Sequence, residues 1–223
     1  MRQIWWIGWG LAFAGFVILD SLRLAGVGND VMDQVSSIIK FLSIASILLY
    51  ALIYRRHNSL LVIAISLTLL ADTMLFWTNQ LEWGVFVFCF AQIFHTFRLV
   101  RVKSVFLLGY GLALLAVFVW LVTNNVEAIY ALAFIYGSLL LLNVFLSWQY
   151  RWVTFLGFAF FLACDVNVGL SFLAGNGSLP YGVAPIAGFL VFIFYMPSQA
   201  LLVSGNDHIT PEEVGKASNS LFR

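Results

Sequence analysis

Apolar residues fill most of this chain in long runs, and short polar stretches separate one run from the next. Each run is close to the roughly 20 residues that an α-helix needs to cross the hydrocarbon core of a bilayer. The pattern therefore predicts an all-α, polytopic membrane protein with eight transmembrane helices. The predicted helices comprise residues 4–26, 32–54, 59–78, 82–100, 104–123, 126–147, 152–174 and 181–204.

The connections between these segments are very short, which predicts that consecutive helices are antiparallel neighbours. We therefore expect residues 1–204 to form one transmembrane domain, with no room for a soluble domain. Residues 205–223 are polar, and we interpret them as a solvated cytoplasmic tail without chemistry of its own. Within this tail, Thr210-Pro211-Glu212-Glu213 has the pattern of a short helix start.

The composition also indicates a membrane protein. Hydrophobic residues make up 62% of the chain and charged residues only 9%, whereas a soluble domain carries roughly 25% charged residues. The net charge of +1 and the lack of a basic tract give no indication of nucleic-acid binding. Cys89 and Cys164 lie inside apolar runs, so they predict neither a disulfide framework nor a CxxC metal site. We interpret both as small buried hydrophobes.

Basic residues predict the orientation, because Lys and Arg accumulate on the cytoplasmic side of membrane proteins. The first segment resembles a signal peptide, but no small-x-small cleavage site follows it, and we interpret it as a retained span. With the N-terminus inside, Arg23 falls outside and Lys40 lies within the membrane. We expect both termini in the cytoplasm and a bacterial cytoplasmic membrane as the location. The basic residues on the cytoplasmic side are then Arg2, Arg55, Arg56, Arg98, Arg101, Lys103, Arg151, Lys216 and Arg223.

Three charged residues, Lys40, Asp72 and Asp165, interrupt apolar runs at similar depths in the outer half of the membrane. A charge at membrane depth costs at least about 2.5–3.5 kcal/mol, and such residues commonly mark functional sites. One acid of a buried pair can stay protonated while its partner is ionised beside a cation. Asp72 and Asp165 are therefore the candidate catalytic acids, and Lys40 is the candidate cation. The alternative is a structural ion pair between helices, although buried ion pairs stabilise poorly relative to apolar packing.

Gln92 and His95 lie on the same side of the predicted helix 82–100 as Phe88. His95 is the histidine expected at membrane depth, since His57 falls in a loop and His208 in the tail. A catalytic zinc ion usually has three protein ligands, often several of them histidines, and one histidine with two aspartates is a thin set. We therefore expect His95 to be hydrogen-bonded in a cavity wall, and we expect no metal and no cofactor.

Tyr195 and Gln199 share one face of the predicted helix 181–204, and Pro197 between them frees a backbone carbonyl near Ile193. These residues either shape a polar pocket or satisfy one another through hydrogen bonds between helices, and the sequence leaves both alternatives open.

The remaining polar residues at depth are expected to be structural. Asp20 and Arg23 are three residues apart, which predicts a local ion pair near the outer interface. The residues expected to hydrogen-bond between helices are Asn143, Ser147 and Asn167.

A faint internal repeat relates the first four segments to the last four, which suggests a possible 4+4 parallel repeat. Leu-Ala precedes an aspartate in the third segment of each half, with one extra residue before Asp165. The fourth segment of each half carries an aromatic residue four positions before a glutamine. The repeat predicts that the third and fourth helices of both halves surround one cavity. The aromatic–glutamine pairs are Phe88/Gln92 and Tyr195/Gln199.

No serine nucleophile elbow, Walker loop, HExxH or CxxC motif is present. At the polar positions above, the sequence resembles the YhhN-like, lysoplasmalogenase family of small eight-helix membrane proteins. Ile39-Lys40-Phe41-Leu42 resembles the family's helix-2 lysine, and Leu70-Ala71-Asp72-Thr73-Met74-Leu75 resembles its Gly-Asp-x-x-Leu motif with Ala71 in place of glycine. Phe161-Leu162-Ala163-Cys164-Asp165 resembles the second aspartate motif. Tyr195-Met196-Pro197-Ser198-Gln199 resembles the closing Tyr-Tyr-x-x-Gln, with Met196 in place of the second tyrosine.

The chain departs from the family pattern in the fourth helix. That pattern has glycine, phenylalanine four residues later, histidine four later and tyrosine three later, where this chain has Gly84, Phe88, Gln92 and His95. The imidazole is thus shifted by about one turn along the same helix face, which either preserves its role or changes the substrate. We expect Gln92 and His95 to face the cavity, with His95 hydrogen-bonded to the polar cluster or to the substrate headgroup.

The resemblance implies a hydrolase that cleaves the vinyl ether bond of lysoplasmalogens in the bilayer, releasing a fatty aldehyde and a glycerophospho-headgroup. The chemistry needs a proton donor, a carboxylate that faces an oxocarbenium ion, and water, much as in glycosidases. Asp72 and Asp165 would be catalytic in such an enzyme. The alternative is a small-molecule or lipid transporter, or a non-catalytic membrane protein, that uses the same buried charges. The residues expected to contact the substrate or balance its charge are Lys40, Gln92, His95, Tyr195 and Gln199.

Overall fold

The structure is a computed structural model, and it describes residues 2–78, 80–99, 105–148 and 151–205. These residues form eight α-helices and no strand, and each helix begins and ends within two residues of the predicted segment. The predicted tail lies outside the described residues, apart from Gly205. The helices are α1 (Arg2–Leu24), α2 (Asp30–Tyr54), α3 (Ser59–Trp77), α4 (Leu81–Leu99), α5 (Val105–Thr123), α6 (Ala128–Trp148), α7 (Trp152–Gly175) and α8 (Val183–Ser204).

Five of these helices, α1, α2, α6, α7 and α8, are long and apolar enough to cross a membrane. The other three have 19 residues each, which at 1.5 Å per residue gives about 28 Å, close to the thickness of the hydrocarbon core. Large apolar side chains such as Leu108, Leu112 and Leu115 are exposed on the outside of the bundle. A lipid environment accounts for such a surface, and the chain is an all-α polytopic membrane protein.

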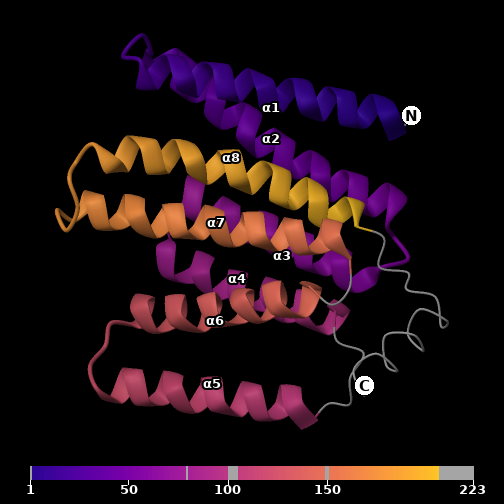
Figure 1. Cartoon of the computed structure of the whole chain (residues 1–223), viewed down its shortest axis with the longest axis vertical. Helices are drawn as coiled ribbons and strands as arrows, with labels where there is room; N and C mark the ends of the chain where they lie inside the picture. The colour runs from indigo at the N-terminus through magenta and orange to yellow at the C-terminus, as the bar shows by residue number, and fades with distance from the viewer. Residues whose placement is uncertain (1, 79, 100–104, 149–150, 206–223) are drawn as a thin grey trace.

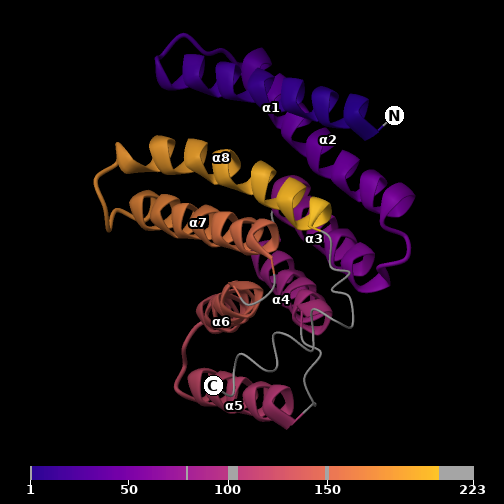
Figure 2. The same ribbon diagram turned by 45° about the vertical axis from the view of Figure 1, so that its right-hand side comes forward.

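The helices lie side by side, with α1 and α5 at opposite ends of the elongated molecule and α3, α4, α7 and α8 between them (Figure 1). The view in Figure 2 shows the same order of helices. Packed pairs in the first half, α1–α2, α2–α3 and α3–α4, correspond to α5–α6, α6–α7 and α7–α8 in the second half. The contacts between the halves correspond as well, because α4 packs on α6 and α8 packs on α2. This is the arrangement that a parallel repeat requires.

Two glycines allow close packing within the central four helices. A Cβ atom at Gly84 of α4 would lie 2.6 Å from the side chain of Leu75 on α3. A Cβ atom at Gly157 of α7 would lie 2.9 Å from the side chain of Leu202 on α8. The α3–α4 and α7–α8 pairs therefore approach more closely at these points than a larger residue would permit.

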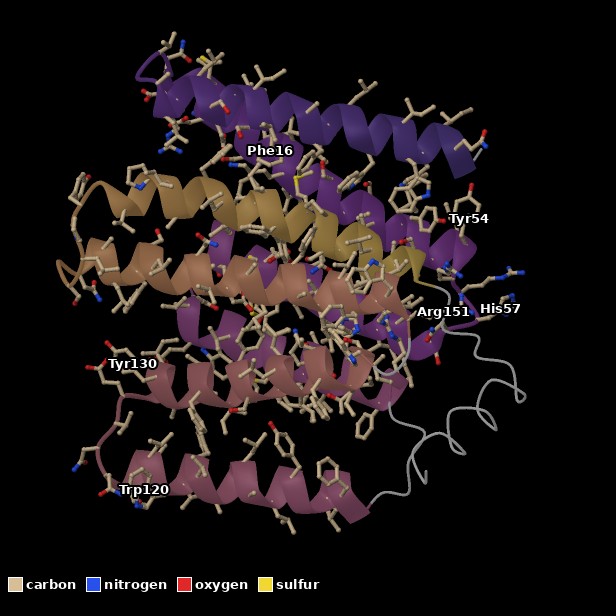
Figure 3. The ribbon with its side chains drawn as sticks, viewed as in Figure 1. Phe16, Tyr54, His57, Trp120, Tyr130 and Arg151 are labelled. Carbon is tan, nitrogen blue, oxygen red and sulfur yellow. The ribbon has the colours of Figure 1, made fainter. Side chains whose placement is uncertain are left out.

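Hydrogen bonds join the end of α2 to the end of α8 at one end of the bundle. The Arg55 guanidinium, just after α2, donates to the Val203 carbonyl at 3.1 Å and to the Ser204 carbonyl at 2.7 Å. These are terminal carbonyls of α8 that have no partner within the helix. His57 and Arg151 lie at the same end, and Trp120 and Tyr130 lie at the other (Figure 3). We call these the Arg151 end and the Trp120 end.

Candidate functional site

Asp72 lies at the centre of the bundle, on the wall of a cavity. Its carboxylate is buried and accepts a hydrogen bond of 2.5 Å from the hydroxyl of Tyr195. These two residues are 123 positions apart, and they join α3 to α8. The cavity has a volume of about 190 Å³ and lies between α2, α3 and α8. Its lining residues are Ser37, Lys40, Phe41, Ile44, Asp72, Trp77, Phe192 and Tyr195.

Lys40 lines the same cavity, but its direct partner is Asp20 of α1. The ammonium donates to the Asp20 carboxylate at 2.5 Å, and Ser36 donates to the other carboxylate oxygen at 2.5 Å. The ammonium also lies 4.4 Å from the centre of the Phe192 ring, within the range of a cation–π interaction. The prediction that Lys40 serves directly as the cation of the two central aspartates is therefore corrected, because Asp20 holds it.

The predicted Asp20–Arg23 pair does not form either. Arg23 instead pairs with Asp33 of α2 at 3.4 Å, near the Trp120 end of the α1–α2 hairpin. Asp20 thus points into the bundle, whereas Arg23 points to the outside, and the local spacing of three residues did not reveal this difference.

Asp165 has a corresponding but separate arrangement. It is half-buried on α7 and accepts a hydrogen bond of 2.5 Å from the hydroxyl of Tyr136 on α6. It does not line the cavity that contains Lys40 and Asp72, which corrects the prediction that all three charged groups face one cavity. The two carboxylates thus belong to separate hydrogen-bonded pairs, Asp72 with Tyr195 and Asp165 with Tyr136.

Aromatic rings connect the two aspartate–tyrosine pairs. The Phe161 ring lies 5.6 Å from the Tyr195 ring and 6.1 Å from the Phe88 ring, measured between centroids. The Phe88 ring in turn lies 5.6 Å from the Tyr136 ring. Each aspartate therefore has its own tyrosine donor, and buried phenyl rings fill the space between the pairs. Sequence reasoning found Tyr195 but missed Tyr136, because nothing distinguishes this tyrosine from other aromatic residues in an apolar helix.

With this geometry established, comparison with known proteins gives one match. The model of the YhhN family matches residues 35–206, which is 172 of the 223 residues. The chain belongs to the YhhN family. The matched span contains Lys40, Asp72, Asp165 and Tyr195, whereas Asp20 lies outside it. No curated protein and no solved structure matches the chain.

In this YhhN-family protein, the polar residues of α4 do not reach the cavity. Gln92 is fully buried, and its side-chain oxygen accepts a hydrogen bond of 2.8 Å from Asn143 of α6. Thr96 donates to the side-chain oxygen of Asn143 at 2.9 Å. The prediction that Asn143 hydrogen-bonds between helices is thus confirmed, whereas the expectation that Gln92 and His95 face the cavity is wrong.

His95 is fully buried, and its ring meets the Phe158 ring of α7 edge to face with centroids 5.2 Å apart. Neither ring nitrogen has a hydrogen-bond partner among the described residues, so the expected hydrogen bond to the polar cluster is absent there. Within the same described residues, no group of three His, Cys, Asp or Glu side chains is arranged to hold a metal ion.

Two other predicted interhelical hydrogen bonds are also corrected. The Asn167 amide donates to the Ala163 carbonyl at 2.7 Å, and the Ser147 hydroxyl donates to the Val144 carbonyl at 2.8 Å. Both acceptors belong to the same helix as the donor. Local backbone carbonyls compete well for short polar side chains in helices.

Buried polar atoms without a partner gather on the Arg151 side of Asp72. Among the described residues, Trp9 Nε1 on α1 and Tyr50 Oη on α2 are two of them. The five in the central four helices are Thr68 Oγ1, Gln92 Nε2, both ring nitrogens of His95, and Gln199 Oε1. A buried polar group left unpaired costs roughly 1–3 kcal/mol. Five such atoms would together cost about 5–15 kcal/mol, which equals the whole folding free energy of a typical protein.

Proposed function

We propose that this YhhN-family protein is a membrane-embedded hydrolase that cleaves the vinyl ether bond of lysoplasmalogens. The products would be a fatty aldehyde and a glycerophospho-headgroup. The observation that carries the proposal is Asp72, hydrogen-bonded by Tyr195 on the wall of a cavity that also contains the Lys40 ammonium. Family membership and the resemblance of the aspartate motifs support it.

Asp72 would act as the general acid. Its carboxylic acid gives a proton to the outer carbon of the vinyl ether, and the ether carbon becomes an oxocarbenium ion. Water adds to this carbon and loses a proton, which leaves a hemiacetal. The hemiacetal then collapses to the aldehyde and the glycerol hydroxyl, so the net reaction consumes one water. Tyr195 keeps the Asp72 carboxyl in one orientation through its hydrogen bond.

Asp165 would stabilise the cation. Its carboxylate is held by the hydrogen bond from Tyr136 on α6. A negative group near a developing oxocarbenium ion lowers the energy of the transition state, as in glycosidases. The two aspartates would then have unequal roles, because only Asp72 lines the cavity.

The Lys40 ammonium, positioned by Asp20, would bind the phosphate of the lysolipid headgroup. Lys40 lines the cavity while Asp20 holds its ammonium from behind. The cavity also contains Trp77, which is exposed at the end of α3. With the Trp120 end facing the outer leaflet, as the basic residues predict, a lysolipid would enter the cavity from that leaflet.

Release of fatty aldehyde by the purified protein tests this function. The protein in detergent or nanodiscs is given a lysoplasmalogen and, as control, the 1-alkyl lysophospholipid with the same headgroup but no double bond. We expect aldehyde from the first substrate only. Asp72→Asn should lower turnover by about 10²–10⁴-fold, the usual worth of general acid–base assistance. Asp30→Asn, at the exposed start of α2, is the matched control and should have no effect.

A transporter is the second candidate, because the matching packing of the two halves is also found in transporter folds. If well-folded protein releases no aldehyde from the lysoplasmalogen, the hydrolase proposal fails. Uptake of a labelled lysolipid into proteoliposomes that depends on Asp72 would then favour transport.

A further inference from the structure

Within the described part of the central four helices, three helices contribute five unpartnered polar atoms on the Arg151 side of Asp72. Thr68 is on α3, Gln92 and His95 are on α4, and Gln199 is on α8, and all four residues are fully buried. Hydroxyls elsewhere on these helices donate to the carbonyl one turn earlier, as Ser66 does to Val62 at 2.8 Å. The Thr68 hydroxyl makes no such bond, so it is available to a group outside its own helix.

Helix geometry places Thr68 and Gln199 next to the Asp72–Tyr195 hydrogen bond, on its Arg151 side. Thr68 precedes Asp72 by four residues, and Gln199 follows Tyr195 by four residues. Residues four apart share a helix face. Because α3 and α8 run in opposite directions (Figure 1), both steps lead toward the Arg151 end. Thr68 and Gln199 therefore form the next layer beneath the aspartate.

His95 belongs to the layer that follows. Its ring lies against Phe158 of α7, and the neighbouring Gly157 is in close contact with Leu202 of α8. Leu202 is three residues after Gln199 on α8. On α4, Gln92 is about one turn closer to the Trp120 end than His95. The four polar residues thus follow one another from the level of Asp72 toward the Arg151 end, inside the central four helices.

The chemistry of these atoms indicates what they bind. A neutral histidine presents one donor and one acceptor, Gln92 Nε2 is a donor, Gln199 Oε1 is an acceptor, and a hydroxyl serves as both. A metal ion would be repelled by the donors, and an anion would be repelled by the acceptors. Water satisfies both kinds of group, and buried water commonly occupies such positions.

We infer that Thr68, Gln92, His95 and Gln199 hold a column of internal water that reaches Asp72 from the Arg151 end of the bundle. The column lies on the side of Asp72 opposite to Trp77, which lines the cavity proposed to bind the lysolipid. Where the proposed hydrolase function holds, it delivers the water that the reaction consumes and returns a proton to Asp72. Lipid and water would then approach the same carboxyl from opposite ends of the protein.

Hydroxyl-radical footprinting by radiolysis of water tests for the column without reference to catalysis. Bound water generates radicals in place, so a buried side chain is modified only where water lies beside it. Met196 is the probe, because it is fully buried and three residues before Gln199 on the same face of α8. We expect oxidation of Met196 in the folded protein, whereas Leu61, fully buried in an apolar cluster, should stay at background.

Two variants make the test specific. Thr68→Val keeps the shape of the side chain and removes the hydroxyl, and Gln199→Leu removes the acceptor. Either should cause loss of Met196 oxidation, whereas Ser66→Ala, on the same helix with its hydroxyl already satisfied, should leave it unchanged. Met196 that stays unmodified in the wild-type protein, or that is modified equally in all variants, would overturn the inference.

The catalytic consequence has a separate readout. Thr68→Val should lower the turnover of lysoplasmalogen hydrolysis by roughly fivefold to tenfold, about the free energy of one hydrogen bond, with KM unchanged. If Met196 is oxidised as expected but the wild-type protein releases no aldehyde, the water column stands and the proposed hydrolase function fails. If aldehyde is released and Met196 is never oxidised, the hydrolase stands and the column does not.

Discussion

The Asp20–Lys40 ion pair offers the sharpest test of how this bundle tolerates buried charge. Asp20→Asn removes the negative charge and leaves the Lys40 ammonium facing a neutral amide. The side chains of Asp20 and Lys40 are only 8% and 12% exposed, so bulk solvent compensates little for the lost partner. We expect Asp20→Asn to destabilise the protein substantially, and we expect the loss to be reversed when the lysine is removed as well.

The magnitude follows from the contacts. Removing one partner of a buried ion pair usually costs about 3–5 kcal/mol. Here the Phe192 ring, 4.4 Å from the ammonium, still provides a cation–π interaction, and the asparagine oxygen can still accept from Ser36. We therefore expect about 2–4 kcal/mol of destabilisation. The double variant Asp20→Leu with Lys40→Met replaces the pair by apolar groups and should come within about 1 kcal/mol of the wild type.

Reversible unfolding in mixed detergent and SDS, followed by circular dichroism, measures these free energies. Asp33→Asn is the matched control, because Arg23 and Asp33 are 61% and 40% exposed and their pair should be worth at most about 1 kcal/mol. A cost of Asp20→Asn no larger than that of Asp33→Asn would refute the reasoning. So would a double variant that is as unstable as the single one. If Lys40 also binds the headgroup, the double variant should be stable but bind lysolipid more weakly.

Three further outcomes follow from the site. Tyr195→Phe removes the hydroxyl that donates to Asp72, and should slow aldehyde release more than Tyr136→Phe, whose target Asp165 lies outside the cavity; equal effects would contradict the unequal roles. His95→Phe should impair aldehyde release more than His57→Ala, since only His95 is buried on the path to Asp72, and similar rates would show that His95 serves packing alone. Gly157→Ala adds a Cβ 2.9 Å from Leu202 and should destabilise the protein by about 1–3 kcal/mol in the unfolding assay; an unchanged free energy of unfolding would contradict the close packing of α7 on α8.

The positions of the helices could be predicted from the sequence because long apolar runs have few other stable structures in a bilayer. Depth could be predicted as well, since the rise per residue is fixed, and Lys40 and Asp72, which were predicted at similar heights, line one cavity. Rotation about each helix axis could not be predicted. Asp20 has Arg23 one turn away in sequence, yet its carboxylate points to Lys40 on the next helix. Periodicity is weak in helices that are apolar on all sides, so it does not fix which face is inside.

The same limit explains the other corrections. The shift of the imidazole to His95 was visible in the sequence, but whether that face looks toward the α2–α3–α8 cavity or toward Phe158 depends on how α4 is rotated. Tyr136 carries no charge, so no argument from the cost of burial distinguished it from Tyr130 or Tyr110. Its role became visible only when α6 was placed against α7.

The separation in sequence between partners has a consequence for biosynthesis. Lys40 finds Asp20 only 20 residues earlier, so the α1–α2 hairpin can enter the membrane with its charges already paired. Asp72 is different, because Tyr195 is 123 residues later. At ordinary rates of synthesis, about 5–20 residues per second, the aspartate waits roughly 6 to 25 s for its donor. During that interval the nascent chain has a carboxyl group at membrane depth without its final partner. The arrival of α8, which Arg55 then fastens at its last carbonyls, is the step that ends this exposure.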